Sequence, residues 1–180
     1  MAVDTRTLTG GIQIRGLRRS DGSRLRVAYQ VNRDFLAPWE PVRPDEFFTD
    51  EGQMASVDAK LNQYEAGRLV PWVLLQGERI VGTITLNDIV RGPFLNGHVA
   101  YWVDKEFNGH GVCSAALAFV VETARNELGL HRVQAATLCG NVASQKVLKH
   151  TGFDEIGLAP SYLKIAGQWQ DHMLYQRVLY

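Results

Sequence analysis

The feature that most constrains the fold is a change of periodicity near the middle of the chain. Between residues 72 and 103, short runs rich in β-branched and aromatic residues are separated by Gly, Asn and Pro, which is typical of an antiparallel meander. Beyond residue 111, helical and strand-like patterns alternate. The expected strands are Trp72–Leu75, Ile80–Leu86, Gly97–Val103, Arg132–Leu138, Tyr162–Ile165 and His172–Val178, and the expected helices are Val112–Leu128 and Val142–His150. This order predicts an α+β fold with helices packed on the faces of a sheet.

The first third of the chain is expected to be helical apart from one loop. Ser20 or Asp21 is a typical N-cap for a first helix, and a second helix is expected from about Asp45 to Glu65, ending at Gly67. Between them, Phe35–Pro41 is an aromatic loop with two prolines. No repeat or Pro/Ser-rich linker interrupts the 180 residues, so we expect one domain spanning residues 1–180.

Charge and cysteine content limit the partners of this chain. Nineteen Lys and Arg balance nineteen Asp and Glu, so the chain lacks the positive excess that grips a nucleic-acid backbone. Direct nucleic-acid binding is therefore not expected. Cys113 and Cys139 show no paired metal-binding spacing and are too few to staple a secreted domain. Both are expected to be reduced thiols, and no metal site is predicted.

Apolar residues nowhere run long enough to span a bilayer. Residues 1–11 contain few of them, and the longest apolar stretch, Ala115–Val121, is far shorter than the ~18–20 residues that a membrane span needs. We therefore expect a cytoplasmic protein with no membrane partner. The sequence leaves both a monomer and a homodimer open.

A glycine-containing loop between a strand and a helix is well suited to bind an anion. In the run Tyr101–Ala116, the strand ends near Val103, Gly109 and Gly111 flank His110, and a helix begins directly afterwards. Small residues let backbone N–H groups approach a phosphate, with the positive end of the helix dipole behind them. A Gly-x-Gly pattern also suits a plain tight turn, and neither the dinucleotide-binding pattern nor the P-loop pattern is complete here.

A second segment, about thirty residues later, decides between these interpretations. The run Asn141–Phe153 begins with an N-cap residue, continues as one helix and ends at Gly-Phe. Together, Asn108–Cys113 and Asn141–Ser144 resemble the two motifs of the GNAT superfamily of acetyl-CoA-dependent N-acetyltransferases. Four further segments resemble its RimJ/RimL branch, and RimJ-type enzymes most of all. These segments are Pro38–Arg43, Val90–Phe94, His131–Val133 and Gly167–His172.

The resemblance implies a fold and a cofactor. The fold is a GNAT fold, with a central mixed, mostly antiparallel sheet of about seven strands that is splayed in the middle and carries helices on both faces. Acetyl-CoA would lie in the splay, with its diphosphate on the amides at the start of the helix. The implied cofactor-binding residues are Trp102, Val103, Asp104, Asn108, Gly109, His110, Gly111, Val112, Cys113, Ser114, Asn141 and Lys146. His110 and Lys146 also suit plain solvated side chains.

The resemblance also implies the chemistry, which is direct attack of a neutral amine on the thioester in a ternary complex. RimJ-type enzymes act on the N-terminal alanine of a ribosomal protein, so a protein α-amine is the implied acceptor and ribosome association is the implied context. A main-chain N–H near Val103 is the expected oxyanion donor. Ser144, or a water held by Asn141, is implied to meet the sulfur. Glu40 is expected to contact the ammonium or relay its proton, although a solvated loop acid would also fit.

The expected acceptor-binding residues are Phe35, Trp39, Glu40, Tyr101 and Asp171. Trp39 also suits a packing anchor, and Asp171 a structural hydrogen bond between strands. Because Tyr101 and Trp102 are adjacent on one strand, their side chains are expected on opposite faces of the sheet.

Three positions depart from the superfamily pattern. Asn108 stands where Gln or Arg is usual, Cys113 stands where Gly or Ala is usual, and Leu148 stands where many members carry a tyrosine that protonates the departing thiolate. Two alternatives therefore stay open, an acetyltransferase of a small-molecule amine and a non-catalytic acyl-CoA-binding or ribosome-assembly module. Neither cysteine is expected to be a nucleophile, since no signature pairs it with an activated histidine.

Overall fold

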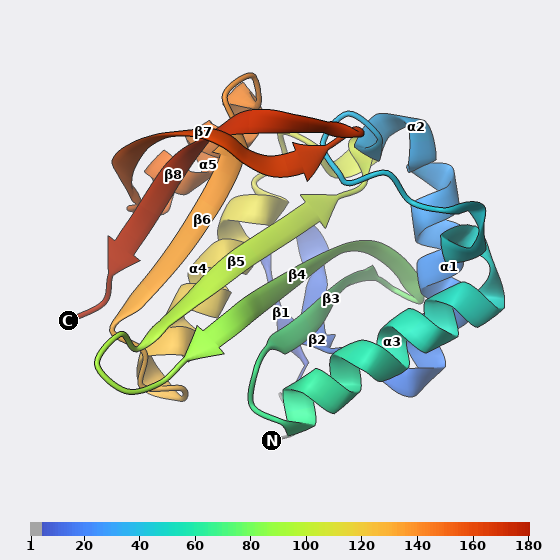
Figure 1. Cartoon of the computed structure of the whole chain (residues 1–180). Coiled ribbons are helices and arrows are strands. Elements are labelled where there is room, and N and C mark those ends of the chain that lie inside the picture. Colours follow the sequence, from blue (N-terminus) through green and yellow to red (C-terminus); the bar gives the residue numbers. More distant parts are fainter. Residues whose placement is uncertain (1–4) are drawn as a thin grey trace.

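The computed structural model describes residues 5–180 and is built on one eight-stranded sheet in the order β1-β2-β3-β4-β5-β6-β8-β7 (Figure 1). Every neighbouring pair is antiparallel except β5 and β6, which are parallel. The strands are β1 (Arg6–Thr7), β2 (Gln13–Gly16), β3 (Val70–Gln76), β4 (Arg79–Val90), β5 (Asn96–Val103), β6 (Arg132–Leu138), β7 (Asp154–Ile165) and β8 (Gln168–Val178). The expected α+β class with a mixed, mostly antiparallel sheet is confirmed.

Five α-helices and four short 3-10 turns complete the described chain. The helices are α1 (Gly22–Val31), α2 (Arg33–Leu36), α3 (Asp50–Glu65), α4 (Val112–Asn126) and α5 (Val142–His150). The 3-10 turns are η1 (Thr9–Gly11), η2 (Arg19–Asp21), η3 (Asp45–Phe48) and η4 (Lys105–Phe107). No helix among residues 5–180 has the length and apolar character needed to cross a bilayer. The first four residues of the apolar-poor start of the chain lie outside the described residues.

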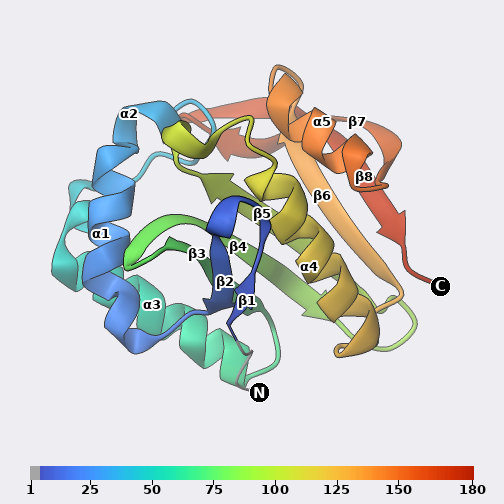
Figure 2. The same ribbon diagram turned by 180° about the vertical axis from the view of Figure 1, so that it is seen from behind.

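The helices cover both faces of the sheet, as expected. Helices α4 and α5 lie on the face seen in Figure 2, where Leu117, Val120 and Leu148 join a core with strand residues such as Trp72. Helices α1 and α3 lie on the opposite face and form a second core. The apolar stretch within α4 is therefore a buried helix face, which agrees with its shortness relative to a membrane span.

The sheet opens between β5 and β6. Their parallel pairing is confined to Asn96–His98 of β5 and Arg132–Gln134 of β6. Beyond these residues, β5 stays paired with β4 up to Val103, while β6 follows β8 up to Leu138. Figure 1 shows the two strands diverging from this short contact. The expected splay in the middle of the sheet is thus present.

Several expected element boundaries are wrong. Strands β1 and β2 were not expected, which gives eight strands where about seven were expected; both are too short for an alternating pattern to be recognised. The helix expected over 45–65 is split at Thr49, whose hydroxyl accepts the Gly52 N–H and caps α3. Strand β7 begins at Asp154 rather than at Tyr162, since as an exposed edge strand it shows no buried periodicity.

The first helix begins directly after Asp21, so the expected N-cap position is confirmed, but the Asp21 side chain does not cap the helix. Asp21 directly precedes α1, but its carboxylate makes no capping hydrogen bond to the helix. It instead accepts two hydrogen bonds from Arg15, at 2.7 and 2.8 Å, in a pair that is almost fully buried. Aspartate is a typical N-cap residue, but here the guanidinium of Arg15, six residues earlier in the chain, binds the carboxylate oxygens that would otherwise cap the helix.

Candidate active site

A cavity of about 560 Å³ lies where β5 and β6 diverge. Four segments line it: the end of β5, the loop into α4 with the first turn of α4, one side of α5, and α2 with the aromatic loop behind it. Its place follows from the topology, because a parallel pair that separates after three residue pairs leaves the strand edges beyond it apart. The cavity is large enough for an elongated small molecule.

Most of the residues expected at the site line this cavity. They are Phe35, Trp39, Tyr101, Trp102, Val103, Asn108, Gly109, Gly111, Val112, Cys113, Ser114, Asn141, Ser144 and Lys146. Four others are not among its lining residues, namely Glu40, Asp104, His110 and Asp171. Sequence reasoning missed Leu36, Phe107, Ala143, Val147 and His150. The signal for three of these was available, since residues 143, 147 and 150 follow one face of a helix.

The loop into α4 ends in a helix start with open amides. Gly109 and Gly111 have φ of 78° and 76°, a region that residues with a Cβ rarely adopt. No side chain caps α4, so among the described residues the N–H groups of Val112, Cys113 and Ser114 have no acceptor. These amides lie at the positive end of a fifteen-residue helix and line the cavity, an arrangement that favours a bound anion.

Two hydroxyl groups, one from β5 and one from α5, form a hydrogen bond at the cavity. The Tyr101 hydroxyl of β5 lies 2.9 Å from Oγ of Ser144 on α5. The Ser144 N–H in turn donates to Oδ1 of Asn141 at 3.1 Å, which caps α5. Burial raises the pKa of Tyr101, so its hydroxyl stays protonated at neutral pH. Leu148, one turn along α5, is buried in the core and offers no polar group.

Tyr101 and Trp102 point to opposite faces of the sheet, as expected. While Tyr101 packs toward the α4 and α5 face, the Trp102 indole lies in the α1 and α3 core. Its Nε1 donates to the Tyr29 hydroxyl at 3.0 Å. The Trp102 side chain is therefore a core residue.

Cys113 lines the cavity, and its thiol is not activated. Burial raises its pKa to about 12, so the nucleophilic thiolate is scarce at neutral pH. Cys139 is exposed, and its sulfur lies 3.6 Å from the Asp171 carbonyl oxygen.

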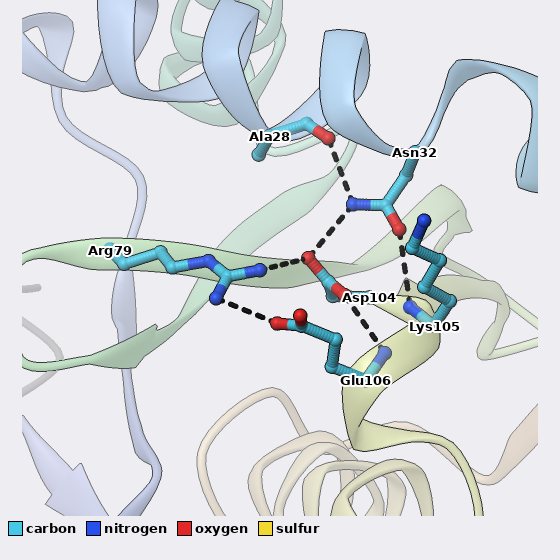
Figure 3. A network of polar contacts seen from close by, with 6 residues as sticks. All are labelled: Ala28, Asn32, Arg79, Asp104, Lys105 and Glu106. Atoms are coloured by element: carbon cyan, nitrogen blue, oxygen red, sulfur yellow. Dashed lines mark hydrogen bonds and ion pairs between the residues drawn. The ribbon is translucent and has the colours of Figure 1, made fainter.

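Asp104 does not line the cavity, but its buried carboxylate binds residues of three neighbouring segments (Figure 3). Its side chain is 1% exposed and follows directly after β5. One carboxylate oxygen accepts from Asn32 Nδ2 at 2.9 Å and from Arg79 at 2.6 Å, and the other accepts the Glu106 N–H at 2.9 Å. Its main-chain N–H donates to Val81 at 2.8 Å. The main-chain contact with pantetheine expected of Asp104 thus has no free N–H.

Asn32 joins the two walls of the cavity through the Asp104 carboxylate. It is fully buried between α1 and α2, and its Nδ2 also donates to the Ala28 carbonyl at 3.0 Å. Its Oδ1 accepts the Lys105 N–H at 3.1 Å (Figure 3). Burial alone would raise the pKa of Asp104, but the hydrogen bonds from Asn32, Glu106 and Arg79 outweigh it and lower this pKa. One amide therefore fixes both the α2 wall and the start of the loop that leads to the open amides.

Glu40 and Asp171 lie beside the cavity in other contacts. The Glu40 carboxylate lies 3.4 Å from Arg43, and its carbonyl accepts the Ala166 N–H of the last hairpin turn. The Asp171 carboxylate accepts the Ser161 N–H at 2.8 Å, which is the structural alternative considered for it. His110 is exposed and does not line the cavity.

Comparison with known proteins gives one consistent family. The acetyltransferase (GNAT) domain family matches residues 12–154. "Probable N-acetyltransferase YjcK" of Bacillus subtilis is 32% identical over 91% of this chain and 91% of its own length. The [ribosomal protein uS5]-alanine N-acetyltransferase of Escherichia coli is 30% identical over 94% of this chain and 88% of its own. The structure of Mycobacterium smegmatis RimJ in complex with CoA-disulfide superposes with a TM-score of 0.92, at 26% identity, over 99% of this chain and 87% of that one.

Proposed function

Because the chain belongs to the GNAT acetyltransferase family, whose members are acyltransferases that use acetyl-CoA, we propose that it acetylates the N-terminal α-amine of a protein. The acceptor we propose is the N-terminal alanine of a ribosomal protein, within the cytoplasm. The observation that carries the proposal is the cavity at the divergence of β5 and β6, which ends at the open amides of α4. Support for the acceptor comes from the relative named for uS5 alanine.

The cavity fits the cofactor on two observations. The start of α4 leaves the amides of Val112, Cys113 and Ser114 open to a diphosphate. The edge of β5 that faces away from β4 is unpaired beyond His98 within the described residues, so it can hydrogen-bond an extended amide chain. We propose that these groups hold the diphosphate and the pantetheine. When bound, acetyl-CoA supplies an acetyl thioester to the part of the cavity lined by Tyr101 and Ser144.

A second hollow continues from the diphosphate site. It has a volume of about 630 Å³ and shares Gly111, Ser114 and His150 with the cavity. Arg177 also lines it, and Lys146 stands on the wall of the first cavity. These cationic side chains suit the remaining phosphate of coenzyme A, so we assign the hollow to its nucleotide end.

The acceptor amine needs little help from a base. An α-amine with a pKa near ~7.7–8.0 is neutral in roughly a quarter of molecules at pH ~7.4, whereas a lysine with a pKa near ~10.4 is neutral in about one per thousand. Phe35 and Trp39 line the cavity on the side of the aromatic loop. We propose that the peptide enters there and that Glu40, on the same loop, contacts the ammonium.

Different polar groups are proposed to contact the oxyanion and the sulfur of the thioester. A main-chain N–H near Val103 is the proposed oxyanion donor, an interaction whose loss costs ~2.7–4 kcal/mol in other enzymes. Ser144 is proposed to meet the sulfur, and Asn141 fixes Ser144 by capping α5. The protonated Cys113 takes no covalent part in this scheme.

The test is thiol release from acetyl-CoA with a short peptide that begins with alanine, measured beside spermidine and beside the same peptide with an acetylated N-terminus. We expect release with the free peptide only. Release with spermidine alone would favour a small-molecule acetyltransferase. Tight coenzyme A binding without release to either acceptor would favour a binding module.

A further inference from the structure

We infer that Tyr101 is a positioning residue that orients the Ser144 hydroxyl toward the sulfur of coenzyme A. This inference rests on the proposed function and assigns Tyr101 a role other than the acceptor contact expected from the sequence. The two side chains come from opposite walls, β5 and α5, and both line the cavity. Their hydroxyl oxygens are 2.9 Å apart, which is the length of a well-formed hydrogen bond.

The contacts of Ser144 fix its main chain and bring its hydroxyl to Tyr101. Its main chain is fixed by the hydrogen bond from its N–H to Asn141 at the start of α5. The Ser144 carbonyl lies 3.5 Å from the Tyr101 hydroxyl, which is much longer than the contact with Oγ. Either hydroxyl can donate in this contact; when Tyr101 donates, Ser144 Oγ is its better-placed acceptor, and the hydrogen of the Ser144 hydroxyl is free to donate to a group bound in the cavity.

Charge development at the sulfur selects this direction of donation. When Tyr101 donates to Ser144 and Ser144 donates onward, both dipoles point toward the thiolate, and the two hydrogen bonds strengthen each other. The reverse order would direct an oxygen lone pair at the negative charge. Because burial raises the pKa of Tyr101, its hydroxyl keeps its proton and remains a donor throughout the physiological pH range.

Acetyl transfer from sulfur to nitrogen requires no proton from the Tyr101 or Ser144 hydroxyl. The amine nitrogen bonds to the carbonyl carbon, the carbon–sulfur bond breaks, and its electron pair stays on the sulfur. The nitrogen releases a proton to solvent, and the sulfur takes up a proton from solvent. Tyr101 and Ser144 act only as hydrogen-bond donors. Leu148, the residue one turn further along α5, has no group that could replace them.

The direct test is the pKa of the coenzyme A thiol in its complex with the protein, followed by the ultraviolet absorbance of the thiolate. We compare the wild type with Tyr101→Phe, which removes only the hydroxyl. The account predicts a bound-thiol pKa about one unit higher in Tyr101→Phe, on the scale of a single hydrogen bond to a charged group. In peptide acetylation, kcat should fall ~10-fold while the KM for acetyl-CoA stays within ~2-fold.

A matched variant and a double variant sharpen the test. Tyr180→Phe removes a hydroxyl that donates to the Gly129 carbonyl; neither residue lines the cavity, so the variant should change neither quantity. Because the two hydroxyls act as a unit, Tyr101→Phe combined with Ser144→Ala should be no slower than Ser144→Ala alone.

The outcomes distinguish failure of the role of Tyr101 from failure of the proposed function. An equal thiol pKa in wild type and Tyr101→Phe, both binding coenzyme A, would overturn the role of Tyr101 and leave the proposed function standing. Coenzyme A binding by a wild type that acetylates no peptide would overturn the proposed acceptor, and the thiol titration would still decide on Tyr101. A wild type without affinity for coenzyme A would overturn both.

Discussion

Replacing Asn32 by alanine should loosen both walls of the cavity at once. The side chain is fully buried and makes three hydrogen bonds, to the Ala28 carbonyl, the Asp104 carboxylate and the Lys105 N–H. The substitution leaves these three partners short of a hydrogen bond in a buried place. A neutral hydrogen bond contributes ~1 kcal/mol and one to a charged group ~1.5–3 kcal/mol, so the loss of two of the first kind and one of the second should lower the free energy of unfolding by about 4 kcal/mol.

That loss is measurable by thermal unfolding. For a chain of this size, about 4 kcal/mol lowers Tm by roughly 8–16 °C. Because Asp104 and Lys105 begin the loop that leads to the open amides of α4, the KM for acetyl-CoA should also rise, by ~5-fold or more. A decrease in stability alone does not predict this second effect.

Gln53→Ala is the matched control. Gln53 is a buried amide whose Nε2 donates to the Phe47 carbonyl, and neither residue lines the cavity. This variant should lose ~1 kcal/mol and keep the KM of the wild type. The reasoning would be refuted if Asn32→Ala were no less stable than Gln53→Ala, or if it kept the wild-type KM at a temperature where both are folded.

Three further predictions concern single groups. Because the pKa of Asp104 is lowered in the folded state, its contribution to stability is present above the unfolded-state pKa of ~3.9 and is lost as the pH falls through the lower folded-state pKa. Asn32→Ala should raise this folded-state pKa and move the acid-unfolding midpoint, followed by circular dichroism, to higher pH. Cys113→Ala should keep kcat within ~2-fold, because its thiol has a pKa of about 12, and a loss of ~100-fold in steady-state turnover would point instead to a covalent intermediate. Asn141→Ala removes the cap of α5 and should cost ~1 kcal/mol; since the cap also fixes Ser144, kcat should fall as well, and a lower Tm with unchanged kcat would reduce Asn141 to a helix cap.

The regular elements near the site were predictable because their patterns are local. Strand β6 and helix α5 have the expected bounds, Arg132–Leu138 and Val142–His150, since buried alternation and capped helical periodicity are written in consecutive residues. The loop containing Gly109 and Gly111 was also predicted from consecutive residues, and both glycines have the positive φ that such a loop needs. The hairpin turn at Ala166 and Gly167 was found for the same reason.

What the sequence did not reveal depends on partners far apart along the chain. Asn32 and Asp104 are 72 residues apart, and no local pattern shows that one fixes the other. Glu40 suited a base by residue type, but the hydrogen bond from the Ala166 N–H of the last hairpin turn to its carbonyl is a tertiary contact that no local pattern shows. The pairing of Tyr101 with Ser144 likewise arises only when β5 and β6 diverge and bring α5 opposite β5.

Calorimetric titration with coenzyme A tests the central claim most directly, through a pair of glycine variants. Gly111 and Gly92 have φ of 76° and 74°, so a valine strains the backbone equally at both, but only Gly111 lines the cavity. We predict saturable binding to the wild type and to Gly92→Val, and at least ~10-fold weaker binding to Gly111→Val, which corresponds to ~1.4 kcal/mol. Equal affinity in all three proteins, or no binding to the folded wild type, would contradict the account.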